Sequence, residues 1–312
     1  MQKFVTPKPA ETQLYKPSHI GGGGRRLCLF AGYCKDGIIP DYVIYYLKKL
    51  SMLCEIHYMA DSEVSDKEIA KIQPYVKSAS AFKHNKYDFG SWQELINMLG
   101  WDYIEQFGQL IFANDSCYAP VFPFEDMFIN MEHRNADFWG VTVNNLVKLP
   151  HIQSYFIVFN KRIIKEAAFR HFMKNIKKEK SHTDIVNKYE IRLTRLLAGI
   201  GYSYASYLDE HLVATSFYMK LLFKKNPFIK TKAFLGDFFV IPPVFCFQVL
   251  QMLNYPVKYI KDNIKSNINA TIRKKIFLRT LKKLIIFSTG PFAKYVISFK
   301  KLLFKQIFHT EF

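Results

Sequence analysis

Apolar and polar residues alternate in short blocks along the first two thirds of the chain, and the blocks switch between strand-like and helix-like spacing. Apolar runs of strand length occur at residues 27–33, 55–59, 79–82, 110–113, 138–143, 154–160 and 202–208. Apolar residues at helical spacing occur at residues 41–53, 66–76, 91–99, 124–131, 163–176 and 184–200. Strands that alternate with helices predict an α/β fold with a mostly parallel sheet.

This pattern divides the chain into three parts. Residues 1–25 end in four glycines and predict a flexible lead-in; a phosphate-binding glycine loop would follow a strand, whereas this run precedes one. Residues 26–214 carry the strand and helix blocks and predict one α/β domain. Residues 215–312 predict a helical basic extension, because apolar residues recur at helical spacing between lysines and arginines, most clearly in 270–287.

One segment of the extension has a length that can cross a membrane. Residues 238–257 carry no formal charge over 20 positions. Pro242, Pro243 and Pro256 interrupt this segment, so we expect buried or interfacial structure in place of a straight span.

The net charge of +18 is concentrated in the same extension. Residues 1–214 hold 26 Lys and Arg against 23 Asp and Glu, whereas residues 215–312 hold 18 against 3. Basic residues beside an apolar helix face are typical of a helix lying on anionic lipid, where each contributes about 1 kcal/mol. The alternatives are a helix pair packed on the first domain, or a nucleic-acid surface, for which the sequence contains no recognised RNA or DNA motif. We expect an anionic membrane surface as partner and no nucleic acid.

Cysteine usage and the first residues indicate the compartment. The five cysteines are odd in number and form no C-x-x-C pair, which fits a reducing compartment and argues against a disulfide framework. Residues 1–25 contain no apolar core of a signal peptide. We therefore expect a cytoplasmic protein, peripheral on the inner face of the plasma membrane.

Polar residues directly after the predicted strands are the first candidates for a site, because ligands bind beyond the carboxyl ends of parallel strands. These residues are Lys35, Asp36, Asp61, Asn114, Asp115 and Ser116. The carboxylate of Asp115 is suited to a divalent cation, Mg²⁺ or Mn²⁺, that neutralises a diphosphate leaving group. The alternative is an aspartate that caps a turn.

Two further segments place polar residues beside predicted elements. Asp88 and Ser91 lie at the predicted start of a helix, where Asp88 can accept from a base or ribose group or cap the helix. His151, Gln153 and Ser154 lead into an apolar strand and are either substrate contacts or structural residues. Zinc is not expected at His151, since no second His or Cys lies at ligand spacing.

Tyr189 and Glu190 lie within the predicted helix 184–200. A glutamate that opens toward the cleft from such a position can deprotonate an acceptor hydroxyl. The alternative is a solvated helical glutamate.

Taken together, these segments resemble the rhamnan synthesis protein F family over about residues 26–265. The matching stretches are KDGIIPDYVIYYLKKL (35–50), YDFGSW (87–92), LIFANDSCYAPVFPFEDMF (110–128), DFWGVT (137–142), HIQSYFIVFNK (151–161), and KYE (188–190) with GYSYASYL (201–208). Gly32-Tyr33-Cys34 departs from the more polar strand end, often with His, that the family pattern suggests.

The resemblance implies a glycosyltransferase with a single GT-A-like domain that uses a dTDP- or UDP-sugar. It implies an acceptor in cell-surface polysaccharide synthesis, such as a rhamnose-rich wall polymer, lipopolysaccharide O-antigen or capsule, or a polyprenyl-linked precursor. It puts Asn114-Asp115-Ser116 at the metal and diphosphate motif, with one acidic residue instead of two, and Glu190 at the catalytic base of inverting members. Because of that single acidic residue, a non-catalytic assembly or scaffold protein of the same pathway is the alternative.

Overall fold

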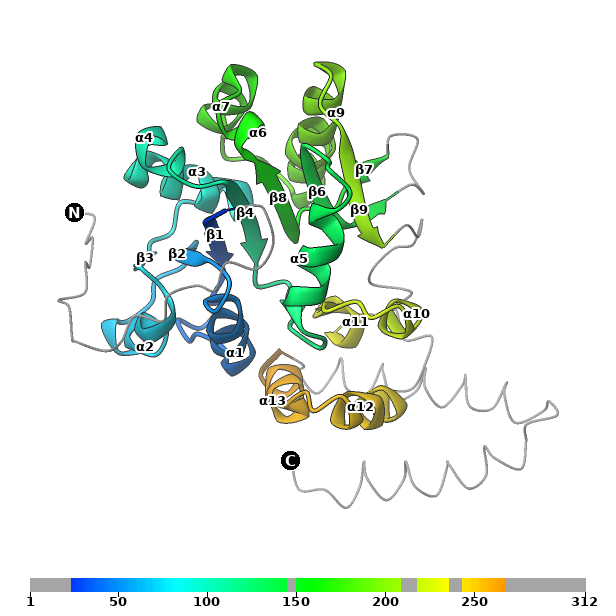
Figure 1. Cartoon of the computed structure of the whole chain (residues 1–312). Helices are drawn as coiled ribbons and strands as arrows, with labels where there is room; N and C mark the ends of the chain where they lie inside the picture. The colour runs from blue at the N-terminus through cyan, green and yellow to red at the C-terminus, as the bar shows by residue number, and fades with distance from the viewer. Residues whose placement is uncertain (1–23, 145–149, 209–217, 236–242, 268–312) are drawn as a thin grey trace. The chain divides into compact units, whose positions relative to one another are not determined.

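The apolar runs form the strands of one mixed sheet in the computed structural model, which describes residues 24–144, 150–208, 218–235 and 243–267. In these residues the sheet has eight strands in the order β3-β2-β1-β4-β8-β6-β7, with β9 also paired to β6 (Figure 1). The strands are β1 (Arg26–Gly32), β2 (Glu55–Ala60), β3 (Ser78–Ala81), β4 (Gln109–Asn114), β6 (Phe138–Asn144), β7 (His151–Ile152), β8 (Phe156–Asn160) and β9 (Tyr204–Leu208). Two short strands, β5 (Cys117–Tyr118) and β10 (Ile229–Lys230), lie outside this sheet.

Strand direction confirms the α/β class and adds one feature that the pattern did not predict. The pairs β1–β2, β2–β3, β1–β4 and β6–β9 are parallel. Strand β8 runs antiparallel to both of its neighbours, β4 and β6. As a result Phe156, at the start of β8, pairs with Ala113, near the carboxyl end of β4.

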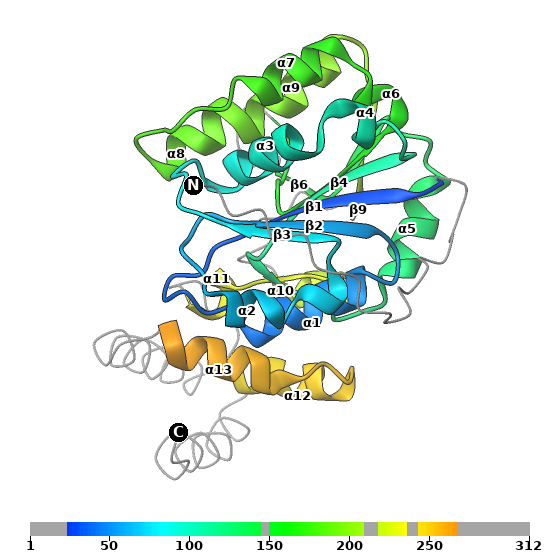
Figure 2. The same cartoon turned by 90° about the vertical axis from the view of Figure 1, so that its left-hand side faces the viewer.

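Helices cover both faces of the sheet in the unit formed by residues 1–229. Figure 2 shows α3, α7 and α9 on one face and α1 and α2 on the other. The helices of this unit are α1 (Asp41–Leu50), α2 (Asp66–Ala70), α3 (Tyr87–Leu99), α4 (Trp101–Ile104), α5 (Phe124–Glu132), α6 (Lys161–Ile164), α7 (Ala167–Lys174), α8 (His182–Ile185), α9 (Ile191–Gly199) and α10 (Tyr218–Phe223). A 3₁₀ helix spans Gln73–Tyr75, and a π-helix, Val186–Glu190, joins α8 to α9.

Two predicted helices are each broken into two. The predicted helix 66–76 ends as α2 and resumes as the 3₁₀ helix, where Pro74 cannot donate a backbone hydrogen bond. The predicted helix 163–176 is divided into α6 and α7, because the Glu166 side chain accepts from the Ala168 amide (3.1 Å) and starts a new helix.

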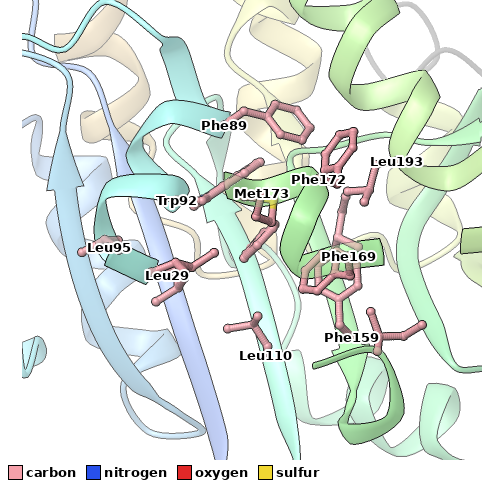
Figure 3. Close-up of a cluster of buried hydrophobic side chains, with 14 of the residues drawn as sticks. Leu29, Phe89, Trp92, Leu95, Leu110, Phe159, Phe169, Phe172, Met173 and Leu193 are labelled. Atoms are coloured by element: carbon pink, nitrogen blue, oxygen red, sulfur yellow. The ribbon is translucent and has the colours of Figure 1, made fainter. Parts of the chain in front are cut away.

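One large part of the core lies between the sheet and the α3–α7–α9 layer. Strand β1 is buried on both faces, which explains its uninterrupted apolar run. Leu29 contributes to the cluster on this side, while Phe30 points to the other face and packs against Tyr46 of α1 (ring centroids 5.1 Å apart). Trp92 of α3 stacks on Phe112 of β4 at 4.6 Å, and Figure 3 shows it among Phe169, Phe172 and other buried side chains.

The second unit spans residues 230–312. Its described residues form α11 (Lys232–Leu235), α12 (Pro243–Met252) and α13 (Val257–Asn267), which confirms the helical prediction for this part of the extension. Cys246 and Leu250 of α12 are buried, in agreement with the buried structure expected within 238–257. Among the described residues, no helix combines the length and apolar character needed to cross a membrane.

Several predictions fall on residues that the structure does not describe. They concern the lead-in up to residue 23, the domain boundary at 214, and the basic segment 270–287 with the lysine-rich stretch after it. These remain predictions from the sequence.

The replacement Trp92→Ala tests the packing of α3 on the sheet. Trp92 is fully buried, and its indole N–H donates to the Ala113 carbonyl (3.2 Å). We expect a loss of about 3–5 kcal/mol in the free energy of unfolding, measured by urea denaturation followed by circular dichroism. Ile129→Ala on α5, where the side chain is 43% exposed, is the control. It should change the free energy of unfolding by about 0.5 kcal/mol or less. Equal losses in the two variants would contradict this packing.

Candidate active site

The carboxylate of Asp115 lies at the carboxyl ends of β1 and β4. Its Oδ2 accepts from the Tyr33 amide (2.6 Å), and its own amide donates to the Ala31 carbonyl (3.2 Å). The Tyr42 hydroxyl of α1 donates to the Asp115 carbonyl (2.9 Å). These bonds fix both the backbone and the side chain of Asp115, which is half-buried.

Asn114 joins this strand end to α3. Its Nδ2 donates to Asp88 Oδ2 (2.7 Å), and its Oδ1 accepts from the amide (3.1 Å) and the hydroxyl (2.6 Å) of Ser116. The four predicted site residues Asp88, Asn114, Asp115 and Ser116 therefore form one hydrogen-bonded or adjacent group. Asp88 lies in the first turn of α3 but makes this tertiary bond.

The negative charge of Asp88 disfavours ionisation of Asp115. Burial, and then the negative charge of Asp88, raise the pKa of Asp115 to about 7, against the opposing effect of the Tyr33 amide bond. Near neutral pH, Asp115 is thus close to the point at which it takes up a proton. A positive charge placed between the two carboxylates would relieve the same repulsion.

The donor set fits a hard divalent cation that also binds a phosphate ligand. Mg²⁺ and similar ions prefer oxygen ligands and are often held by one or two carboxylates together with substrate phosphates. Asp88 and Asp115 supply such carboxylates. Within the described ranges, no group of three or more His, Cys, Asp or Glu side chains is arranged to hold a metal ion.

Glu190 forms a second group at the end of the π-helix. Its Oε1 accepts from His151 Nε2 (3.1 Å), and its Oε2 accepts from the Ser154 amide (3.0 Å) and the Ser154 hydroxyl. Burial acts to raise the pKa of Glu190, but the bonds from His151 and Ser154 outweigh it and lower the pKa below the usual value. Glu190 is therefore held as a carboxylate at neutral pH.

The two groups lie at the same edge of the sheet. The Asn114 amide donates to the carbonyl of Tyr155 (3.3 Å), which follows Ser154 and precedes β8. The Asp115 group and the Glu190 group are thus connected through one hydrogen bond between β4 and the start of β8. On the other side of the same edge, Phe89 of α3 packs on Tyr189, with ring centroids 5.6 Å apart.

Two other predicted residues, Asp61 and Ser91, hold the start of α3. Asp61 accepts from the amides of Asn85 and Tyr87, and Ser91 is buried with its hydroxyl 3.0 Å from His84 Nε2. These tertiary bonds explain why α3 begins at Tyr87, four residues before the predicted start.

The remaining four predicted residues take different positions, and Lys35, the first of them, is exposed. Gln153 Oε1 accepts from the Thr142 hydroxyl (2.7 Å). Tyr189 is buried, and its hydroxyl accepts from the Lys177 amide (2.9 Å) and donates to Glu179 Oε1 (2.8 Å), so its contact with substrate stays a prediction. Asp36 is exposed in the turn after β1.

The sequence did not identify the residues that act through backbone or tertiary contacts. These are Tyr33, whose amide binds Asp115, Tyr42, and Thr194, whose hydroxyl accepts from the Ile152 amide (3.2 Å). The unusual Gly32 has a packing explanation: a Cβ there would lie 2.2 Å from the hydroxyl of Tyr58. In the sequence, only the departure of Gly32-Tyr33-Cys34 from the family pattern indicated that this region was unusual.

Comparisons with known proteins give one family and distant structural likenesses. Uncharacterized protein y4gN of Sinorhizobium fredii is 23% identical over 177 residues, 56% of this chain and 46% of that protein, so the chain spans less than half of this relative. Core-mannan synthase A from Aspergillus fumigatus in its Mn/GDP form has a TM-score of 0.34 at 9% identity, over 61% of this chain and 76% of that one. The 4-diphosphocytidyl-2C-methyl-D-erythritol synthase from Anaerococcus prevotii has a TM-score of 0.37 at 11% identity, over 65% and 95%.

Likeness at these TM-scores carries no conclusion about function. The rhamnan synthesis protein F family, in contrast, matches residues 56–299, which is well over half of the sequence. The chain belongs to the rhamnan synthesis protein F family.

Proposed function

We propose that this protein is a glycosyltransferase that moves a sugar from a nucleotide-diphospho-sugar to a growing cell-surface polysaccharide or a lipid-linked acceptor. The observation that carries the proposal is the pair of carboxylate groups at one sheet edge, with the pKa of Asp115 raised and that of Glu190 lowered. Family membership supports rhamnose as the transferred sugar and a dTDP- or UDP-linked donor.

The Asp115 group is the proposed site for the donor diphosphate. Asp88 and Asp115 would hold a divalent cation, Mg²⁺ or Mn²⁺, which when bound neutralises charge that develops on the leaving diphosphate. The Tyr33 amide orients the Asp115 carboxylate toward this position, and Asn114 orients Asp88. The nucleoside would lie near the ends of β1 and β2.

Glu190 is the proposed acceptor of the proton from the attacking hydroxyl. A carboxylate has about four acceptor positions, and the three observed bonds place two on Oε2 and one on Oε1. Oε1 can therefore accept a further hydroxyl. His151 and Ser154 act as positioning residues, because they fix the orientation of the carboxylate and hold it ionised.

We also propose that the extension from residue 215 holds the enzyme on the inner face of the plasma membrane. The support is its composition: 18 Lys and Arg against 3 Asp and Glu, interleaved with apolar residues at helical spacing. A lipid-linked acceptor would be available at that surface.

Flotation with liposomes tests the membrane proposal. The full chain should float with vesicles of 30% phosphatidylglycerol and remain unbound with pure phosphatidylcholine, and 0.5 M salt should reduce binding, because salt screens exposed charges. Equal binding to both kinds of vesicle would contradict the charge-based account, and retention on oligonucleotide resin alone would favour a nucleic-acid surface.

Glu190→Gln and Asp115→Asn should separate chemistry from donor binding. Glu190→Gln removes the proton acceptor, so kcat for sugar transfer should fall about 100-fold or more, while donor affinity, measured by calorimetry, stays within about twofold.

Asp115→Asn should weaken donor binding in the presence of Mn²⁺, because one of the two carboxylates is lost. Asp102→Asn, an exposed position on α4, is the matched control. Unchanged turnover in the Glu190→Gln variant would contradict the role of Glu190 as proton acceptor. A wild-type protein that is inactive with every donor would favour the alternative of a non-catalytic scaffold protein.

The raised pKa of Asp115 predicts a pH-dependent stability. The pKa of Asp115 is about 7 in the folded protein, against an ordinary value of 3.8. Between these two pH values, Asp115 keeps its proton in the folded protein but releases it in the unfolded chain. Stability from this group therefore declines as pH rises from about 4 through 7. The side chain at position 115 cannot ionise in the Asp115→Asn variant. In EDTA, this variant should therefore have a higher Tm than the wild type at pH 8, and the difference in Tm should be smaller at pH 5. An equal difference at both pH values would contradict the raised pKa.

A further inference from the structure

The first residue of α3 is an exposed tyrosine in a backbone conformation that tyrosine rarely adopts. Tyr87 has a φ of 57°, and Asn85, two residues earlier, has a φ of 60°. The Tyr87 side chain is 44% exposed, so burial of its ring does not account for this geometry. A residue held in the left-handed region while its ring faces solvent suggests that the position of the ring is used.

Side chains from two neighbouring segments hold this loop in place. Asp61, directly after β2, accepts from the Asn85 amide at Oδ1 (2.7 Å) and from the Tyr87 amide at Oδ2 (3.2 Å). His84 in turn bonds the buried Ser91 of α3 at 3.0 Å. The position of Tyr87 is thus fixed by the end of β2 and by α3 itself.

The three residues at the start of α3 contact three different segments of the chain. The ring of Tyr87 lies against His182 of α8, with centroids 6.1 Å apart at 77°, and α8 lies beside α3 in Figure 2. Asp88 belongs to the proposed diphosphate group. Phe89 packs on Tyr189, the residue before the proposed base. The Tyr87–His182 pair therefore lies beside both the donor carboxylates and the helix that carries the base.

We propose that Tyr87, held against His182 by an edge-to-face contact, offers a stacking face for a sugar ring of the acceptor. This inference rests on the proposed function, in which an acceptor hydroxyl must reach Glu190 next to the donor. The sugar units that follow that hydroxyl then need a surface near α8, the helix that leads into the π-helix ending at Glu190. An aromatic ring offers a flat apolar face for the C–H face of a pyranose and leaves its hydroxyls hydrated.

The test uses the full chain, a synthetic trirhamnoside as acceptor probe and dTDP-rhamnose as donor. Tyr87→Ala should raise the KM for the trirhamnoside about tenfold and leave kcat and the donor KM within about twofold. Tyr87→Phe keeps the ring and should stay within about twofold of the wild type. His182→Ala, on a short helix capped by Ser181, should change the acceptor KM in the same direction. Tyr75→Ala, in the 3₁₀ helix before β3, is the matched control.

A binding measurement keeps this inference separate from the proposed function. Saturation-transfer NMR without donor should show contact between the wild type and the trirhamnoside, and that signal should be lost in Tyr87→Ala but kept in Tyr75→Ala. No signal with the wild type, or a Tyr87→Ala variant that matches the control, would overturn the stacking surface. A raised donor KM in place of the acceptor KM would assign Tyr87 to the donor and also overturn it. Absence of transfer with an intact NMR signal would count against the proposed function alone.

Discussion

The position of β4 between a parallel and an antiparallel neighbour is the constraint on which the site depends. Because β1 runs parallel to β4 and β8 runs antiparallel to it, the ends of β1 and β4 meet the start of β8 at one edge. Asp115 takes the Tyr33 amide from the β1 side, while Asn114 donates to Tyr155 on the β8 side. A reversed β8 would carry Ser154 and its bond to Glu190 to the opposite edge.

The two carboxylate groups differ in what surrounds them, and this difference suits them to separate tasks. Asp115 is half-buried beside Asp88, and these two effects outweigh the backbone hydrogen bonds to its carboxylate, so its negative charge is disfavoured. Glu190 has donors on both oxygens and stays ionised in spite of burial. Many active sites contain two acidic groups whose environments move their pKa values apart. Such sites stabilise charge and transfer protons.

The sequence predicted the α/β class, the residues at the strand ends and every strand of the main sheet except the two-residue β7, because buried strands and their polar ends have a local signature. It did not predict that β8 is antiparallel, since an apolar run carries no information about direction. It also placed the start of α3 at residue 91, because the bonds that start this helix at Tyr87 come from Asp61, 26 residues earlier. Asp115 and Glu190 were proposed from their neighbours in the sequence, but their shared edge is a property of the tertiary structure.

The central claim is that Asp88 and Asp115 together receive the phosphate end of a sugar nucleotide. A crystal structure of the full chain grown with dTDP and Mn²⁺ tests it most directly, because manganese can be located by its anomalous scattering. We expect a manganese peak in contact with both carboxylates and the diphosphate, with Glu190 facing the same space. A nucleotide bound at another edge of the sheet, with no manganese at Asp115, would contradict it.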